Sequence, residues 1–145
     1  MPLTNPGGFY TLHNMTDGGG ISSAVDSTTY YVGSYLIFDV DGSYNSHALV
    51  SPLTCRITSM RSVFVNGGNP GAPSTHRVTY SIRVEDTTDH AVGDQDWRNS
   101  TVTRYTGLSI PLQEGQSFAI KIATPTWSTN PAVIFNSLQL GYAVP

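Results

Sequence analysis

The residues that most often carry chemistry are scattered along this chain and do not form a recognisable motif. Two imidazoles reach one metal from a single strand or helix only at i, i+2 or i, i+4 spacing. None of the four histidines has such a neighbour: they are His13, His47, His76 and His90. A metal or acid–base role would therefore need convergence in the folded chain, and the spacing favours histidines in turns or on the surface.

Short acidic segments give equally weak signals. The DVDG sequence at 39–42 resembles the start of a calcium loop, but an EF-hand would carry a glutamate at position 50, where this chain has Val50. We interpret 39–42 and the DQD sequence at 94–96 as turns. Glu85 and Glu114 are too far apart in the sequence to indicate a glycosidase pair.

No nucleophile stands out. Cys55 is the one cysteine, which excludes an intrachain disulfide. It alternates with Leu53 and Ile57, which predicts a small buried hydrophobic residue. There is no Gly-x-Ser-x-Gly elbow, and the glycines at 18–20 lack the Gly-Lys-Ser/Thr that follows in a phosphate-binding loop. The sequence therefore predicts a protein that binds and assembles, with no enzymatic activity, cofactor or metal.

Two tryptophans offer a different kind of contact. Trp97 and Trp127 could act as stacking platforms for sugars, because an aromatic ring supplies a large contact area at a small entropic cost. Packing in the core or at its rim is the commoner use of such residues. Both interpretations stay open at this point.

The elements that would position these residues are strands. Lys121 is the only lysine and there are two glutamates, so no segment has the Glu/Lys pairs of a solvated helix. Short apolar alternations separated by Gly, Pro, Asn and Asp predict seven or eight strands, at 28–32, 35–40, 53–65, 77–84, 101–105, 108–112, 117–123 and 133–144. This pattern predicts an all-β fold, an antiparallel jelly-roll-like β-sandwich.

Three local features refine this prediction. In 53–65 the apolar residues change parity between Ile57 and Met60, which predicts a β-bulge near Thr58 and Ser59. Pro111 cannot donate to a strand ladder, so its strand should lie at a sheet edge or end there. The polar segment 85–100 reads as a connection between strands.

The first 27 residues differ from the rest because Pro and Gly interrupt every potential element. We therefore divide the chain into an extended N-terminal arm, 1–27, and a sandwich domain, 28–145. Isolated apolar residues of the arm cannot form a core among themselves, so they either dock on another surface or stay mobile. They are Phe9, Tyr10, Leu12, Met15 and Ile21.

Charge and hydropathy exclude several partners. The formal net charge is −3 and the six arginines are not clustered, so neither nucleic acid nor an acidic membrane surface is expected to bind. The N-terminus lacks a basic region followed by an apolar run, and no stretch approaches the length needed to span a bilayer. We expect a protein made in the cytoplasm without a secretion signal.

Three segments in the last third carry a family resemblance: TGLSIPL at 106–112, EGQSFAIKI at 114–122 and TPTWSTNP at 124–131. They resemble a β-module of tailed-bacteriophage virion proteins, and 56–66 and 80–89 are similar to its earlier strands. The likeness covers roughly 52–144, and the loop around Trp127 is its most specific part. Such modules occur as capsid decoration (cement) proteins, often trimeric jelly rolls with an N-terminal arm, and as knobs of head or tail fibres.

The resemblance implies a virion protein and no catalytic residues. Our first expectation is a homotrimeric decoration protein on the outer capsid surface of a bacteriophage, made in the host cytoplasm, that stabilises contacts between major capsid proteins. The arm would bind the capsid, because a segment with spaced apolar anchors can order across a junction between subunits. The alternative is a receptor- or glycan-binding fibre knob that uses Trp97, Trp127 and the loop 66–74.

Overall fold

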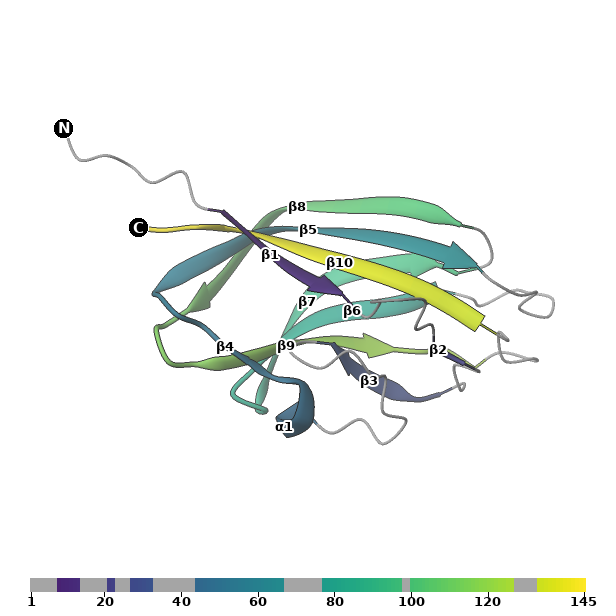
Figure 1. Ribbon diagram of the computed structural model, residues 1–145, viewed down its shortest axis with the longest axis horizontal. Coiled ribbons are helices and arrows are strands. Elements are labelled where there is room, and N and C mark those ends of the chain that lie inside the picture. Colours follow the sequence, from purple (N-terminus) through teal and green to yellow (C-terminus); the bar gives the residue numbers. More distant parts are fainter. Residues whose placement is uncertain are drawn as a thin grey trace.

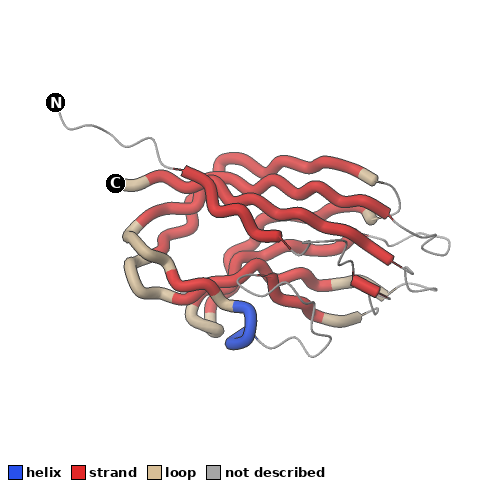
Figure 2. Tube along the Cα trace, viewed as in Figure 1, coloured by secondary structure: helices blue, strands red, loops and turns tan. Residues whose placement is uncertain are grey.

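The computed structural model describes residues 8–13, 21–22, 27–32, 44–66, 77–97, 100–126 and 133–145 of the chain. Two antiparallel sheets lie face to face in these ranges (Figures 1 and 2). The strands described are β1 (Gly8–His13), β2 (Ile21–Ser22), β3 (Thr29–Val32), β4 (Leu49–Val50), β5 (Cys55–Asn66), β6 (Arg77–Val84), β7 (Thr88–Asp96), β8 (Thr101–Leu112), β9 (Ser117–Ala123) and β10 (Val133–Ala143). A single helical turn, α1 (Tyr44–His47), precedes β4.

The strand order is that of a jelly roll. The first sheet has the order β1-β10-β5-β8, with β2 also paired to β10; the second has the order β3-β9-β6-β7, with β4 also paired to β9. The pairs are nested along the chain: β6 with β7 innermost, then β5 with β8, β3 with β9, and β1 with β10 outermost. A long antiparallel ribbon rolled into two sheets gives this nesting, which confirms the predicted fold class.

The core between the sheets comes from strands with strict alternation. In β6 the side chains of Val78, Tyr80, Ile82 and Val84 are buried, as their period of two predicts. Other large and fully buried side chains are Trp97, Tyr30, Phe64, Phe118, Ile57, Met60, Leu112, Ile120 and Ile122. Each such side chain contributes about 1.5–3 kcal/mol when it leaves water, so this layer holds the sandwich together.

A hydrogen-bond network also joins the sheets inside this core. The Oε1 of Gln95 accepts bonds from Ser62 Oγ at 2.6 Å and from Tyr80 Oη at 2.7 Å. Its Nε2 donates to Thr103 Oγ1 at 3.1 Å, and Trp97 Nε1 donates to Tyr80 Oη at 3.2 Å. Ser62 and Thr103 belong to the first sheet, Tyr80 and Gln95 belong to the second and Trp97 directly follows β7, so the network fixes how the sheets face each other.

The predicted β-bulge is confirmed at Thr58. Ile57 pairs with Ile110 and with Tyr142, whereas Ser59 pairs with Thr106 and Gly141, so the register shifts on both sides of β5. An extra residue in one strand reverses the inward and outward parity beyond it. The bulge therefore lets Ile57 and Met60 both be buried, and it decides which residues of β5 point outward.

The segment 85–100, which we expected to be a connection, contains strand β7. It is an edge strand of the second sheet, and few of its residues are buried. The buried position in its second half is occupied by the polar Gln95, so the apolar alternation that signals a strand is missing. The two strands expected at 101–105 and 108–112 form one strand, β8, which lies at a sheet edge as Pro111 predicts.

Part of the segment expected as an arm lies in the first sheet. β1 pairs with β10 over its full length, with Tyr10 opposite Leu140 and Leu12 opposite Leu138, and Ile21 of β2 lies opposite Ile134. These two strands are short and are flanked by Gly and Pro, so periodicity could not reveal them. Met15 and the strand expected at 35–40 lie outside the described residues.

Candidate functional site

The outward face of the first sheet carries a row of long polar side chains. Arg61 of β5 lies directly opposite Arg104 of β8 on one side and opposite Gln139 of β10 on the other. The neighbours Met60 and Ser62 are buried, and Arg61 is exposed, because parity beyond the bulge turns residue 61 outward. Arg104 is also exposed.

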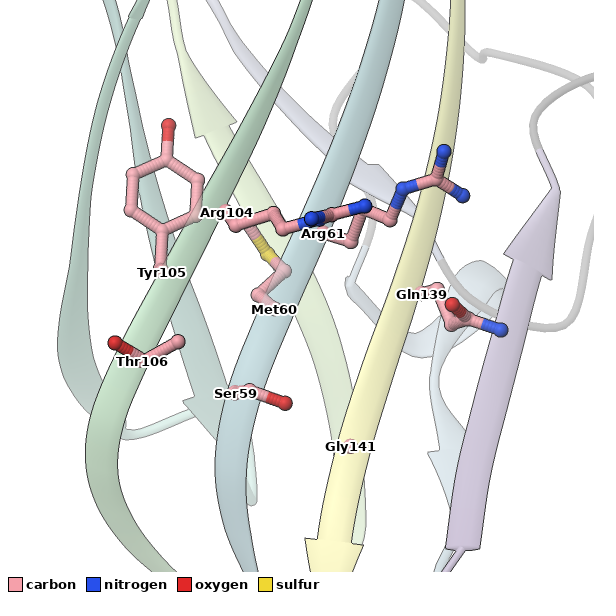
Figure 3. A pocket seen from close by; sticks show the side chains of 8 residues that line it. All are labelled: Ser59, Met60, Arg61, Arg104, Tyr105, Thr106, Gln139 and Gly141. Carbon is pink, nitrogen blue, oxygen red and sulfur yellow. The ribbon is translucent and has the colours of Figure 1, made fainter.

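A pocket of about 440 Å³ opens beside this row (Figure 3). The next row across the same three strands consists of Thr106, Ser59 and Gly141, whose side chains are short or absent. The small row next to the long row leaves a depression in the sheet surface. Its lining residues are Ser59, Met60, Arg61, Arg104, Tyr105, Thr106, Gln139 and Gly141.

The pocket carries positive charge without a carboxylate. None of its lining residues is acidic, and the ion pairs found among the described residues belong to other cations: Arg77 with Asp94, Arg83 with Asp86 and Asp89, and Lys121 with Asp89. Like charges placed directly opposite each other destabilise a sheet. Arg61 and Arg104 are therefore an unfavourable pair that the described part of this chain does not neutralise.

Valines lie next to the arginines on the same outward face. Val63 of β5 is opposite Val102 of β8, one row beyond Arg61 and Arg104. Val102 and Val65 keep 52% and 44% of their surface exposed. Scattered exposed valines are ordinary on protein surfaces, but here they adjoin a charged pocket.

Tyr105 supports the pocket from the side of the sandwich. Its hydroxyl donates to the carbonyl of Asp94 on β7 at 2.6 Å, which ties the edge strands of the two sheets together. Its ring lies so close to Gly93 that a Cβ there would come within 2.6 Å of Tyr105 Cε1. Burial is the largest cause that raises the pKa of Tyr105 above its usual value, so the phenol stays neutral and donates that bond.

A second pocket, of about 270 Å³, lies at the turn between β6 and β7 and is lined in part by Glu85 and His90. Both Glu85 and Asp86 have positive φ, 53° and 54°, and the turn closes with the Thr87 N–H bonded to the Val84 carbonyl. The Glu85 carboxylate accepts bonds from the backbone N–H and the hydroxyl of Ser117. Those bonds hold a strained turn, so the carboxylate has a structural use here.

The structure corrects one predicted glycan contact. Trp97 has no exposed surface and stacks on Phe64, with ring centroids 4.8 Å apart and planes at 6°. A sugar cannot reach a ring that is closed inside the core, so Trp97 is not a stacking platform. Trp127 and most of the loop 66–74 lie outside the described residues.

The other predicted chemistry-bearing residues are dispersed. Cys55 is buried, as expected. His13 ends β1, His47 ends α1 and His90 lies in β7, whereas His76 and the segment 39–42 are outside the described ranges. No group of three or more His, Cys, Asp or Glu that could hold a metal is found in the part of the chain that is described. In that part, no helix has the length and apolar character needed to cross a membrane.

Sequence reasoning did not single out Arg61 and Arg104. Arg61 has the parity opposite to that of Met60, Ser62 and Phe64, which favours an outward position, but parity does not identify a site. The pairing of two arginines 43 positions apart depends on the register of β5 against β8, which a single sequence does not reveal.

Comparisons with known proteins find fold-level likeness only. No protein-family model and no curated protein matches the chain. The coat protein of Tobacco streak virus is similar with a TM-score of 0.43 and 13% identity, over 100% of this chain and 90% of that one. A GH26-CBM35 beta-(1,4)-mannanase of Podospora anserina is similar with a TM-score of 0.42 and 11% identity, over 97% of this chain and 29% of that one.

Proposed function

We propose that this chain is a structural protein of a bacteriophage virion that decorates the outer capsid surface. In this proposal it binds as a homotrimer and stabilises contacts between neighbouring major capsid proteins. Its partners are the major capsid protein and other copies of itself, and it performs no chemical step. The protein is made in the host cytoplasm and joins the particle there.

The observation that carries the proposal is the open edge of β1. Among the described strands, β10 is the only one that pairs with β1, so the other edge of β1 has no partner strand there. Open strand edges present N–H and C=O groups that can pair with another chain. Three of the predicted capsid-binding residues, Phe9, Tyr10 and Leu12, lie in this strand.

Pairing of β1 with β10 also lowers the entropic penalty of binding. A segment that orders only on contact loses conformational freedom at that moment, which weakens its affinity. Residues 8–13 are already held along β10, next to the buried Leu138 and Leu140. A capsid protein that added to this edge would meet a strand fixed in place. Three copies in a trimer would then multiply a modest contact through effective concentration.

The architecture and the family resemblance support the same proposal. Eight-stranded jelly rolls with two sheets are frequent in viral capsid domains and in lectins. The resemblance of residues 52–144 to virion β-modules points to the first of these uses. Both arguments are analogies, so the location of the protein on the particle must be decided by experiment.

Copy number is the deciding measurement. Quantitative mass spectrometry of purified particles, with the major capsid protein as an internal standard, should give hundreds of copies per particle for a decoration protein. Tens of copies or fewer would overturn the proposal and favour the alternative, a receptor- or glycan-binding fibre knob. Size-exclusion chromatography with light scattering of the isolated protein checks the trimer.

A deletion experiment on residues 1–27 must take into account that β1 and β2 belong to the first sheet. Removing them also removes β1 and β2 and exposes β10, so a loss of binding by the fragment 28–145 could reflect a damaged sandwich. The fragment should therefore be compared with and without a synthetic peptide of residues 1–27, after its thermal unfolding has been measured. Capsid binding that returns only with the peptide supports the proposal, and full occupancy by the fragment alone contradicts the role of this segment.

A further inference from the structure

We propose that the pocket beside Arg61 and Arg104 binds an acidic sugar, a saccharide ring that carries a carboxylate. The site belongs to the outward face of the first sheet and shares no residue with β1, so the inference does not depend on the proposed capsid contact. In this site the arginine pair binds the carboxylate, and the neighbouring polar groups form hydrogen bonds with the ring hydroxyls.

The arginines provide the anion-binding half of the site. They lie directly opposite each other, and Figure 3 shows their side chains extending in the same direction from neighbouring strands. A guanidinium is a planar fork that matches a carboxylate with two parallel hydrogen bonds. An anion between the two forks would remove the repulsion between like charges, which no acidic residue lining the pocket relieves.

The remaining lining residues favour a sugar over a simple ion. The pocket of about 440 Å³ is within the range of roughly 300–1,000 Å³ that is usual for small-molecule sites, and a lone carboxylate or phosphate would leave most of it empty. Ser59, Thr106 and Gln139 line the same pocket, and their side chains carry two hydroxyls and an amide. Such groups can both donate to and accept from the hydroxyls of a sugar ring.

The backbone around the pocket is rigid enough to hold this arrangement. All three strands that contribute to it are paired through the rows concerned, and β8 is tied to β7 by the Tyr105 bond to Asp94. Gly141, which lies directly opposite Ser59, has no side chain. A site on paired strands keeps its geometry better than a site on loops.

The test is a titration of the ¹⁵N-labelled full chain with sodium glucuronate, followed by amide chemical shifts. We expect saturable shifts at Ser59, Arg61, Arg104, Thr106 and Gln139, and little response to glucose, the neutral counterpart. Loss of two charge-assisted hydrogen-bonding groups in the double variant Arg61→Gln/Arg104→Gln should weaken binding about tenfold or more. The charge-matched double variant Arg56→Gln/Arg77→Gln, whose arginines lie outside the pocket, should bind as the unchanged protein does.

Two further comparisons separate the sugar from other anions. The variant Arg61→Lys/Arg104→Lys keeps the charge but loses the planar forks, so it should bind glucuronate more weakly than the unchanged protein. Acetate or inorganic phosphate binding as tightly as glucuronate would overturn the assignment to a sugar, and so would tighter binding of an aspartate-rich peptide at the same residues. Equal shifts with glucose, or unchanged binding by Arg61→Gln/Arg104→Gln, would show that the arginine pair does not form an acidic-sugar site.

Discussion

The outward faces of the two sheets differ in how their charged side chains are paired. On the second sheet each cation named above has a carboxylate partner: Arg77 meets Asp94 at 2.6 Å and Lys121 meets Asp89 at 2.6 Å. The bond from Arg77 is the largest cause that holds the pKa of Asp94 below its usual value. On the first sheet, Arg61 faces Arg104 across the strands.

The apolar residues do not divide as sharply as the charges. On the second sheet, α1 covers part of the outward face, because Tyr44 packs edge to face on Tyr31 with ring centroids 5.7 Å apart and Ala119 is buried with them. On the first sheet, Val65 and Val102 are exposed, and on the second sheet Val50 of β4 keeps 64% of its surface exposed, so the contrast between the faces rests on their charges. A face that satisfies its own charges stabilises the monomer, whereas a face that leaves them unsatisfied is suited to a ligand or a partner. This difference points to the first sheet as the binding side.

Both faces depend on one shared core, and the substitution with the largest predicted effect disrupts that core. The side chain of Ile82 has no exposed surface and lies opposite Ile120. Ile82→Asp should destabilise the protein by about 4 kcal/mol or more, because it buries an unpaired charge, and net stabilities are only about 5–15 kcal/mol. Thermal unfolding followed by circular dichroism measures this. Ser81→Asp, on the outward parity of the same strand and opposite Lys121, is the control and should fold normally.

A second change removes hydrogen bonds between the two sheets without removing apolar side chains from the core. Gln95→Leu removes the acceptor of Ser62 and Tyr80 and the donor to Thr103. Buried hydroxyls that lose their partner cost about 1–3 kcal/mol each, so we expect a loss of about 2–3 kcal/mol, since Ser62 and Tyr80 remain within reach of each other. Chemical denaturation is the measurement. Gln113→Leu, at an exposed position, should change stability by about 0.5 kcal/mol or less, and an equal loss there would contradict the role of the network.

These two changes also show how far the sequence predicts the fold. The strands with strict alternation, β6 and β9, have the predicted bounds, and the parity change in β5 located the bulge at Thr58. Strand β7 was missed because Gln95 occupies a buried position that the pattern expects to be apolar. The hydrogen bonds that make glutamine acceptable there come from β5, β6 and β8, and a local pattern contains no information about them.

The candidate site could not be predicted from the sequence for a related reason. Alternation predicts which face a residue occupies but not which residue of another strand lies beside it. Arg61, Arg104 and Gln139 become one row only when β5 is placed between β8 and β10 in the observed register. Trp97 shows the opposite error, since its residue type suggested a contact surface and its stacking on Phe64 places it in the core.

A third change tests whether the ion pairs of the second sheet stabilise the monomer. Asp89 accepts from Lys121 at 2.6 Å and from Arg83 at 3.2 Å, and about a third of its side chain is exposed. Asp89→Asn should therefore lower stability by about 0.5 kcal/mol after screening by solvent is considered. The difference should shrink in 1 M salt, where the Debye length falls to about 3 Å. A loss that is the same at low and high salt would mean that packing, not charge, is responsible.

The smallest expected effect has the opposite sign and bears most directly on the comparison. Arg104→Glu replaces a like-charged pair across β5 and β8 with an opposite-charged one, so it should raise stability by about 0.2–0.5 kcal/mol. Arg77→Glu is the matched control on the second sheet, where the new carboxylate would face Asp94 and Asp96, and it should lower stability. Parallel denaturation of both variants gives the two signs. If Arg104→Glu also destabilises the protein, Arg104 has a stabilising role within the chain, and the contrast between the two faces disappears.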